Sequence, residues 1–206
     1  EFKPDFAEAH SNLGNTLRKL GRLDEALANC RQAIALKPDF AEAHSNLGIT
    51  LKEIGRLDEA LASYNQAIAL KPDNAKAHFN LGNTLKEIGR LDEALASYNQ
   101  AIALKPDFAE AHSNLGITLC EARNYDGALN CFQQAFDLRR GRKSFGGYHQ
   151  QRSAGISKSK LDHDIEQFKY LASLSIKKDF FLRLVSEYKT IWKETTWTSE
   201  TGQTEV

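Results

Sequence analysis

The sequence predicts an all-α protein, an α-solenoid in which similar helix hairpins follow one another in a row. The first observation is a pair of near-identical segments, residues 41–74 and 75–108, with related copies at 7–40 and 109–142. These two segments differ only at Glu42/Lys76, Ser45/Phe79, Ile49/Asn83 and Asn74/Phe108. The second observation is that each copy contains two apolar patterns of helical spacing. About four stacked hairpins are therefore expected over residues 1–140.

Each unit is expected to open with a helix that carries a narrow buried stripe. In the second unit this helix covers about Ala41–Ile54, and its stripe consists of Ala43, Leu47 and Leu51. Gly55 should end it, because glycine suits the left-handed backbone that closes a helix. The equivalent residues of the neighbouring units are Gly21 and Gly89.

The second helix of the unit should cover about Leu57–Leu70 and end before Pro72, which cannot continue a helix. Its apolar face consists of Ala60, Leu61, Tyr64, Ala67 and Ile68. Asp39 followed by Glu42 has the spacing of a capping box for the helix that follows it, which is the one expected over Ala41–Ile54. The same spacing recurs at Asp5/Glu8 and Asp107/Glu110, whereas Asp73 is followed by Lys76 and should lack this partner.

The outer copies depart from the pattern. Cys30 replaces the aromatic residue found at Tyr64, Tyr98 and Phe132, which predicts looser packing in the first unit. In the fourth unit Arg123 replaces the helix-ending glycine, and Asn124 is expected to supply the left-handed turn instead. Arg140 replaces the proline. Decay of this kind is expected where a repeat array ends.

The repeat pattern resembles the tetratricopeptide repeat family. The residues that carry the resemblance are Leu47, Gly48, Leu51, Gly55, Ala60, Tyr64, Ala67 and Pro72, with their equivalents one period away. The resemblance covers roughly residues 1–140 and implies a right-handed superhelix. It also implies that the first helix of each unit lines the concave face.

Three further segments are expected after the repeats. Residues 139–160 are rich in Arg, Lys and Gly without any acidic residue, which predicts a flexible basic connector. Residues 161–194 return to helical spacing and predict a C-terminal helix pair that caps the last repeat. The apolar stripe of that pair includes Phe181, Leu184, Val185, Tyr188 and Trp192, through which the chain could instead self-associate. Residues 195–206 predict a disordered polar tail.

The amino-acid composition limits the classes of function that the chain is expected to have. Lys plus Arg and Asp plus Glu both number 27, so net charge gives no case for nucleic acid or an anionic membrane. No apolar run is long enough to span a bilayer. An odd count of 3 cysteines without CxxC spacing favours a reducing, cytoplasmic compartment. The chain opens inside a repeat and contains no Met, which we interpret as a fragment of a longer protein.

The differences between the near-identical segments 41–74 and 75–108, which we call the twin units, indicate a binding surface. Glu42/Lys76, Ser45/Phe79 and Ile49/Asn83 have the spacing i, i+3, i+7 and share one face of the first helix. Asn15 differs from Ile49 on about the same face. The resemblance places this face on the concave side, so Asn15, Asn83, Lys76 and Phe79 are candidate ligand contacts; drift within the repeats is the alternative.

One polar column on this face does not vary: Asn12, Asn46, Asn80 and Asn114. An Asn amide offers both a donor and an acceptor, so a column of them could hold an extended peptide backbone. This resembles the asparagine ladder in the repeat region of O-linked N-acetylglucosamine transferase. The alternative is that these side chains contact only water.

The sequence contains no constellation that indicates catalysis, and no metal or cofactor is expected. His10, His44, His78 and His112 recur once per repeat, which spreads them along the array and predicts packing rather than a metal site. Nucleotide-binding and nucleophile-elbow motifs are missing.

The sequence therefore predicts a non-enzymatic protein–protein interaction scaffold that binds a peptide segment or a partner protein on the concave repeat face. A second hypothesis is an accessory, substrate-recruiting arm of a larger enzyme whose catalytic domain lies outside this fragment. A third is a self-association module acting through the C-terminal helices.

Overall fold

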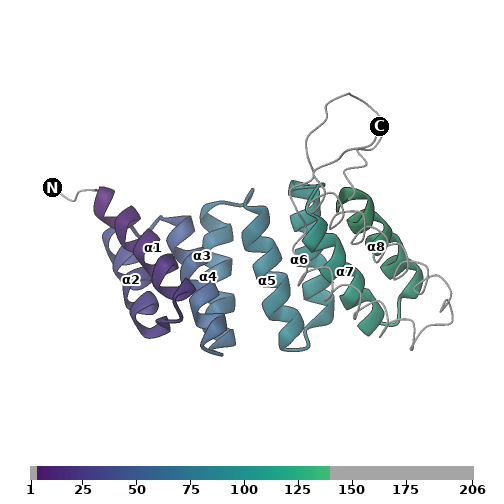
Figure 1. The fold of residues 1–206 in the computed structure, drawn as a ribbon, viewed down its shortest axis with the longest axis horizontal. Helices are drawn as coiled ribbons and strands as arrows, with labels where there is room; N and C mark the ends of the chain where they lie inside the picture. The colour runs from purple at the N-terminus through teal and green to yellow at the C-terminus, as the bar shows by residue number, and fades with distance from the viewer. Residues whose placement is uncertain (1–3, 140–206) are drawn as a thin grey trace, which may run out of the picture.

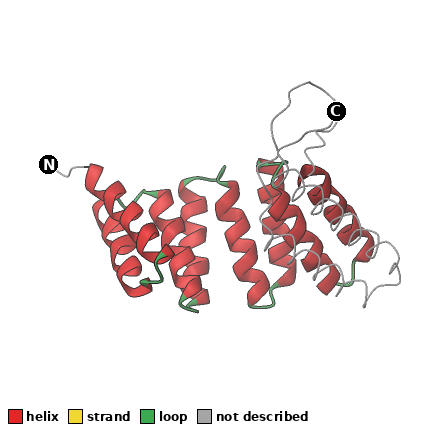
Figure 2. Cartoon of the chain, in the orientation of Figure 1, coloured by secondary structure: helices red, strands yellow, loops and turns green. Residues whose placement is uncertain are grey.

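The computed structural model describes residues 4–139, and this part of the chain is a row of helix hairpins (Figure 1). Its helices are α1 (Pro4–Lys19), α2 (Leu23–Leu36), α3 (Ala41–Glu53), α4 (Leu57–Leu70), α5 (Ala75–Glu87), α6 (Leu91–Leu104), α7 (Ala109–Glu121) and α8 (Tyr125–Arg139). No strand occurs within this range (Figure 2). The all-α solenoid is thus confirmed, and the helices expected over 41–54 and 57–70 are α3 and α4. The expected C-terminal helix pair and tail, over 161–194 and 195–206, and all but the first residue of the 139–160 connector lie outside the described residues.

The turn inside each hairpin needs a left-handed residue. Gly21, Gly55 and Gly89 have φ values of 76°, 85° and 80°, as predicted. In the fourth hairpin the prediction for Asn124 was wrong, because Arg123 itself has a φ of 61°. The helix geometry fixes which residue must turn, so Arg123 adopts it at a cost of about 1–2 kcal/mol. Asn124 instead begins the next helix, where its Oδ1 accepts a hydrogen bond from the Gly127 N–H at 3.0 Å.

The aspartates of two expected capping boxes, Asp39 and Asp107, do not occupy the N-cap position of their helices. Phe40 and Phe108, one residue after the aspartates, are the N-cap residues of α3 and α7, and neither supplies a side-chain cap. Each helix begins too late for the aspartate to reach its first free amides. Of the first helices α3, α5 and α7, the one predicted to lack a carboxylate partner is the one with a side-chain cap, because Asn74 Oδ1 accepts from the Ala77 N–H at 3.2 Å.

Within each hairpin a glycine of the first helix faces a large side chain of the second. A Cβ at Gly48 would lie 2.7 Å from Cε1 of Tyr64, and one at Gly82 would lie 2.8 Å from Cε1 of Tyr98. Gly116 and Phe132 repeat this arrangement at 2.7 Å. The ring therefore fits only where a Cβ is absent. In the first hairpin Cys30 takes the place of the ring and is fully buried, with Sγ 2.9 Å from a Cβ built at Gly14.

A ladder of ion pairs joins consecutive hairpins. Each pair connects a cation in the last turn of one first helix to a glutamate of the next first helix. The pairs are Arg18–Glu53 at 2.6 Å, Lys52–Glu87 at 2.8 Å and Lys86–Glu121 at 3.4 Å. The fourth hairpin has Cys120 at the cation position, so the ladder of the described residues stops there.

Reversing one charge of this ladder should weaken the array. We expect Lys52→Glu to lower the free energy of unfolding by about 0.5–1 kcal/mol, because both partners are partly exposed. The double variant Lys52→Glu/Glu87→Lys restores opposite charges and should recover most of the loss in urea unfolding. A double variant that loses as much as the two single variants combined would show that the pair contributes nothing.

Candidate functional site

The first helices of the hairpins form one layer of the array. Contacts join α1 to α3, α3 to α5 and α5 to α7, whereas no two second helices among residues 4–139 make contacts of that extent. Closer spacing in one layer curves the row toward that side. The closer contacts therefore place the surface formed by α1, α3, α5 and α7, which we call the inner face, on the inside of this curve.

Two residues of the Asn column are held by the preceding hairpin. Asn46 is buried, with 9% of its surface exposed, and its Nδ2 donates to Ser11 Oγ at 3.0 Å. Asn114 Nδ2 donates to Asn83 Oδ1 at 2.7 Å. In both residues the amide oxygen has no hydrogen-bond partner within the described chain. These contacts fix the two side chains and leave one acceptor on each.

The other two residues of the column are free of such contacts. Asn12 is exposed and Asn80 is half-buried, and neither side-chain amide has a hydrogen-bond partner among residues 4–139. Each therefore keeps both a donor and an acceptor for a ligand. The column thus runs along α1, α3, α5 and α7 with its hydrogen-bonding capacity only partly used.

The residues of the first helix that differ between segments 41–74 and 75–108 form what we call the variable stripe. In the third hairpin this stripe has an intramolecular role that sequence reasoning missed. Phe79 packs against Phe108, with ring centroids 4.8 Å apart, and against Tyr98 at 6.0 Å. Asn83 Oδ1 accepts from the Tyr98 hydroxyl at 2.8 Å as well as from Asn114. Three of the twin differences therefore join the third hairpin to the fourth. The signal that could have shown this is the simultaneous change of Ser45/Phe79 and Asn74/Phe108.

The remaining candidates lie at the surface of the same layer. Lys76 is exposed at the start of α5 and has no ion pair within the described range. Asn15 is half-buried, and its Oδ1 accepts from Arg18 at 2.9 Å. Arg18 also pairs with Glu53, so Asn15 belongs to the first step of the ion-pair ladder.

The histidine column braces the loops between hairpins. His44, His78 and His112 bond through Nε2 to the carbonyl oxygens of the prolines that precede their helices. Those prolines are Pro38, Pro72 and Pro106, at 2.9, 3.1 and 3.0 Å. Across residues 4–139, no group of three or more His, Cys, Asp or Glu residues could hold a metal ion.

The thiols are poorly suited to nucleophilic chemistry. Cys120 and Cys131 are free, and burial raises the pKa of each to about 11. Burial also raises the pKa of Cys30. These thiols are therefore protonated at neutral pH, and a protonated thiol is a weak nucleophile. The same desolvation raises the pKa of the Tyr64 and Tyr98 hydroxyls.

Comparison with known proteins agrees with this architecture. A family model described as TPR repeat matches residues 14–55, 50–89 and 82–122, and one described as Tetratricopeptide repeat matches 109–141. The chain belongs to the tetratricopeptide repeat family. No curated protein matches the chain. None of the helices in the described range has the length and apolar character required to cross a membrane.

Several solved structures of MamA share this tetratricopeptide fold. One, titled "Crystal structure of MamA", is 26% identical, with a TM-score of 0.63 over 68% of this chain and 82% of that one. MamA residues 41-end from Desulfovibrio magneticus RS-1 are 23% identical, with a TM-score of 0.61 over 67% and 78%. A third MamA structure is 18% identical and covers 99% of this chain and 100% of its own, with a TM-score of 0.68. The structures at 23% and 18% identity are evidence for the fold alone.

Proposed function

We propose that this tetratricopeptide array is a protein-interaction scaffold that binds an extended peptide segment along its inner face. The observation that carries the proposal is the Asn column, which places one amide on each of four consecutive first helices. Backbone N–H and C=O groups recur along an extended peptide whatever its sequence. An amide on each helix can pair with them without selecting particular side chains.

The existing hydrogen bonds support such a role. Because Nδ2 of Asn46 and of Asn114 is already donated to the preceding hairpin, their amide oxygens are the groups left for a peptide N–H. Fixing a side chain before binding lowers the entropy lost on association. Asn12 and Asn80 would add adaptable contacts on either side. Lys76 would add selectivity for an acidic residue of the ligand.

The charges of the inner face favour recognition by hydrogen bonds over electrostatic steering. Each cation of the ladder is paired with a glutamate of the next hairpin. The whole chain has a formal net charge of +0 at pH 7. A ligand should therefore bind with only a weak dependence on salt concentration.

The variants for testing this must be chosen by their contacts. Asn46→Ala removes the donor that satisfies Ser11 in a buried contact, so it should cost about 1 kcal/mol of stability. Asn12→Ala and Asn80→Ala should instead leave the stability nearly unchanged, because neither side chain has a hydrogen bond within residues 4–139.

We expect the double variant Asn12→Ala/Asn80→Ala to weaken binding of a peptide about tenfold, with an unchanged melting temperature, because two hydrogen bonds of the ligand are lost. The peptide would be selected from a displayed random library on the immobilised chain, and its affinity measured by fluorescence anisotropy. Gln66→Ala/Gln100→Ala is the matched control, since both amides are exposed on second helices. Equal losses in both double variants, or a loss in the control alone, would contradict the proposal.

A further inference from the structure

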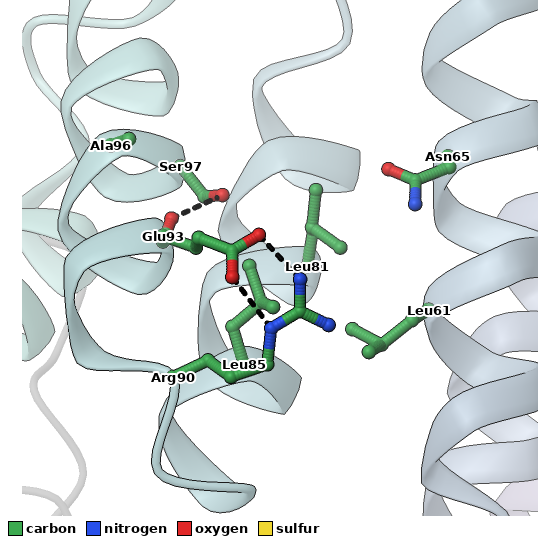
Figure 3. Close-up of a pocket in the computed structure, with 8 residues that line it drawn as sticks. All are labelled: Leu61, Asn65, Leu81, Leu85, Arg90, Glu93, Ala96 and Ser97. Atoms are coloured by element: carbon green, nitrogen blue, oxygen red, sulfur yellow. Dashed lines mark hydrogen bonds and ion pairs between the residues drawn. The ribbon is translucent and has the colours of Figure 1, made fainter.

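A small groove opens on the side of the second helices, away from the Asn column. It lies between α4, α5 and α6 and has a volume of about 260 Å³. Leu61, Leu81 and Leu85 form its apolar floor, and Asn65 and Ser97 lie at its edges (Figure 3). The remaining lining residues are Arg90, Glu93 and Ala96.

The charged edge of the groove consists of one ion pair. Arg90 binds Glu93 through two contacts, Nε to Oε1 at 2.6 Å and Nη2 to Oε2 at 2.5 Å (Figure 3). The hydrogen bond from Arg90 holds the pKa of the Glu93 carboxyl below its usual range. Asp58 also lies near enough to raise the pKa of Arg90, after the larger effect of Glu93. Glu93 therefore has one guanidinium beside it, that of Arg90.

The equivalent glutamate at the interface between the first two hairpins has a second arginine beside it. The residue equivalent to Asn65 in the first unit is Arg31, and the residue equivalent to Glu93 is Glu59. Arg31 reaches across the interface between the first two hairpins, with Nη2 4.0 Å from Glu59 Oε2. Glu59 is also bound by Arg56, as Glu93 is by Arg90. The first interface thus has two guanidinium groups around its glutamate, and the second has one.

The third interface lacks the carboxylate altogether. Asn124 and Gly127 stand where the second interface has Arg90 and Glu93, and Asn99 stands where it has Asn65. Among the three interfaces of the described hairpins, the second therefore combines the glutamate with an uncharged residue at the position of Arg31. Its groove combines an apolar floor with Glu93, whose equivalent in the first interface, Glu59, has a second arginine beside it.

We propose that this groove receives an arginine side chain from a partner protein segment. The methylene stem would lie on Leu61, Leu81 and Leu85, and the guanidinium would reach Glu93 in the manner of Arg31 and Glu59. Arginine suits the groove better than lysine, because its guanidinium is planar, weakly hydrated and able to contact apolar surface. This second site opens between the second helices α4 and α6, over the side of α5, and includes no residue of the Asn column.

The test is a titration of the ¹⁵N-labelled chain with N-acetyl-arginine methylamide, followed by backbone amide shifts. We expect saturable shifts at Leu81, Leu85 and Ser97 with the wild-type chain. Asn65→Arg should supply the cation internally, as in the first hairpin, and abolish these shifts. Asn99→Arg is the matched control at the next interface and should leave them unchanged. Glu93→Gln should weaken binding about two- to fivefold.

Three outcomes would overturn the assignment. They are no saturable shift with the arginine probe, an equal response to the lysine or norleucine methylamide, and undiminished binding by Asn65→Arg. A crystal structure of Asn65→Arg gives an independent check, since its guanidinium should approach Glu93 and not extend into solvent. Peptide binding on the inner face should be unaffected by Asn65→Arg, so failure at one site is distinguishable from failure at the other.

Discussion

Tyr64→Ala is expected to lower the free energy of unfolding by about 3–5 kcal/mol, as for other buried aromatic side chains. Tyr64 is 1% exposed and packs in a cluster with Leu27 and Leu51. Since Leu27 belongs to the first hairpin and Leu81 of the third also packs on this cluster, the ring supports three consecutive hairpins. Its loss should therefore affect the interfaces of the second hairpin as well as its interior.

Urea unfolding followed by circular dichroism measures this loss, and Tyr64→Phe is its control. The phenylalanine keeps the ring and loses only the hydroxyl, so it should cost at most about 1 kcal/mol. The fourth hairpin already has Phe132 at this position. If Tyr64→Phe cost as much as Tyr64→Ala, the hydroxyl rather than the packed ring would hold the hairpin together.

Gly48→Ala is expected to destabilise the wild-type chain by about 1–3 kcal/mol through overpacking. The new Cβ would lie 2.7 Å from Cε1 of Tyr64 and 2.8 Å from its Cδ1, and the ring is buried, so it must press on its neighbours to move away. In the Tyr64→Ala background the obstacle is gone. The same substitution should then stabilise by up to about 1 kcal/mol, because alanine has the higher helix propensity.

The sign of the Gly48→Ala effect in the two backgrounds is the quantity to measure. A reversal of sign would show that the glycine is required by the facing ring. Destabilisation of similar size in both backgrounds would assign the requirement to the backbone of α3 instead. Gly82 and Tyr98 offer the same comparison in the third hairpin.

The sequence alone was sufficient to predict the hairpins because every unit repeats the same physical solution. Helical spacing located α3 and α4, and the left-handed glycines located the turns. The end of the array was harder to predict. Arg123 adopts the left-handed conformation despite its side chain, since the position of the turn is set by the two helices that flank it.

The caps and the variable stripe show the limit of comparing repeats. Asp39 has the right spacing for a capping box, but the helix starts one residue too late for it. Phe79 and Asn83 vary as a ligand contact would, yet in the structure they contact Phe108, Tyr98 and Asn114. A change between repeats can serve a neighbouring repeat, and only tertiary contacts distinguish that from a role in binding.

The Asn column is the part of the candidate site on which the structure adds most. All four residues were singled out from the sequence as equivalent, but they differ in their contacts. Asn46 and Asn114 are anchored to the preceding hairpin, whereas Asn12 and Asn80 have no side-chain partner among residues 4–139. For Asn80, Ile49 stands at the position equivalent to Asn83, so the contact that anchors Asn114 has no counterpart there.

The side-chain amide resonances of the chain, recorded before and after addition of a selected peptide, test the proposed binding face most directly. Binding along the inner face should shift the Nδ2 protons of Asn12 and Asn80 and leave the Nε2 protons of Gln66 and Gln100 in place. Shifts of Gln66 and Gln100 with unchanged Asn12 and Asn80 would contradict it and place the ligand on the second helices.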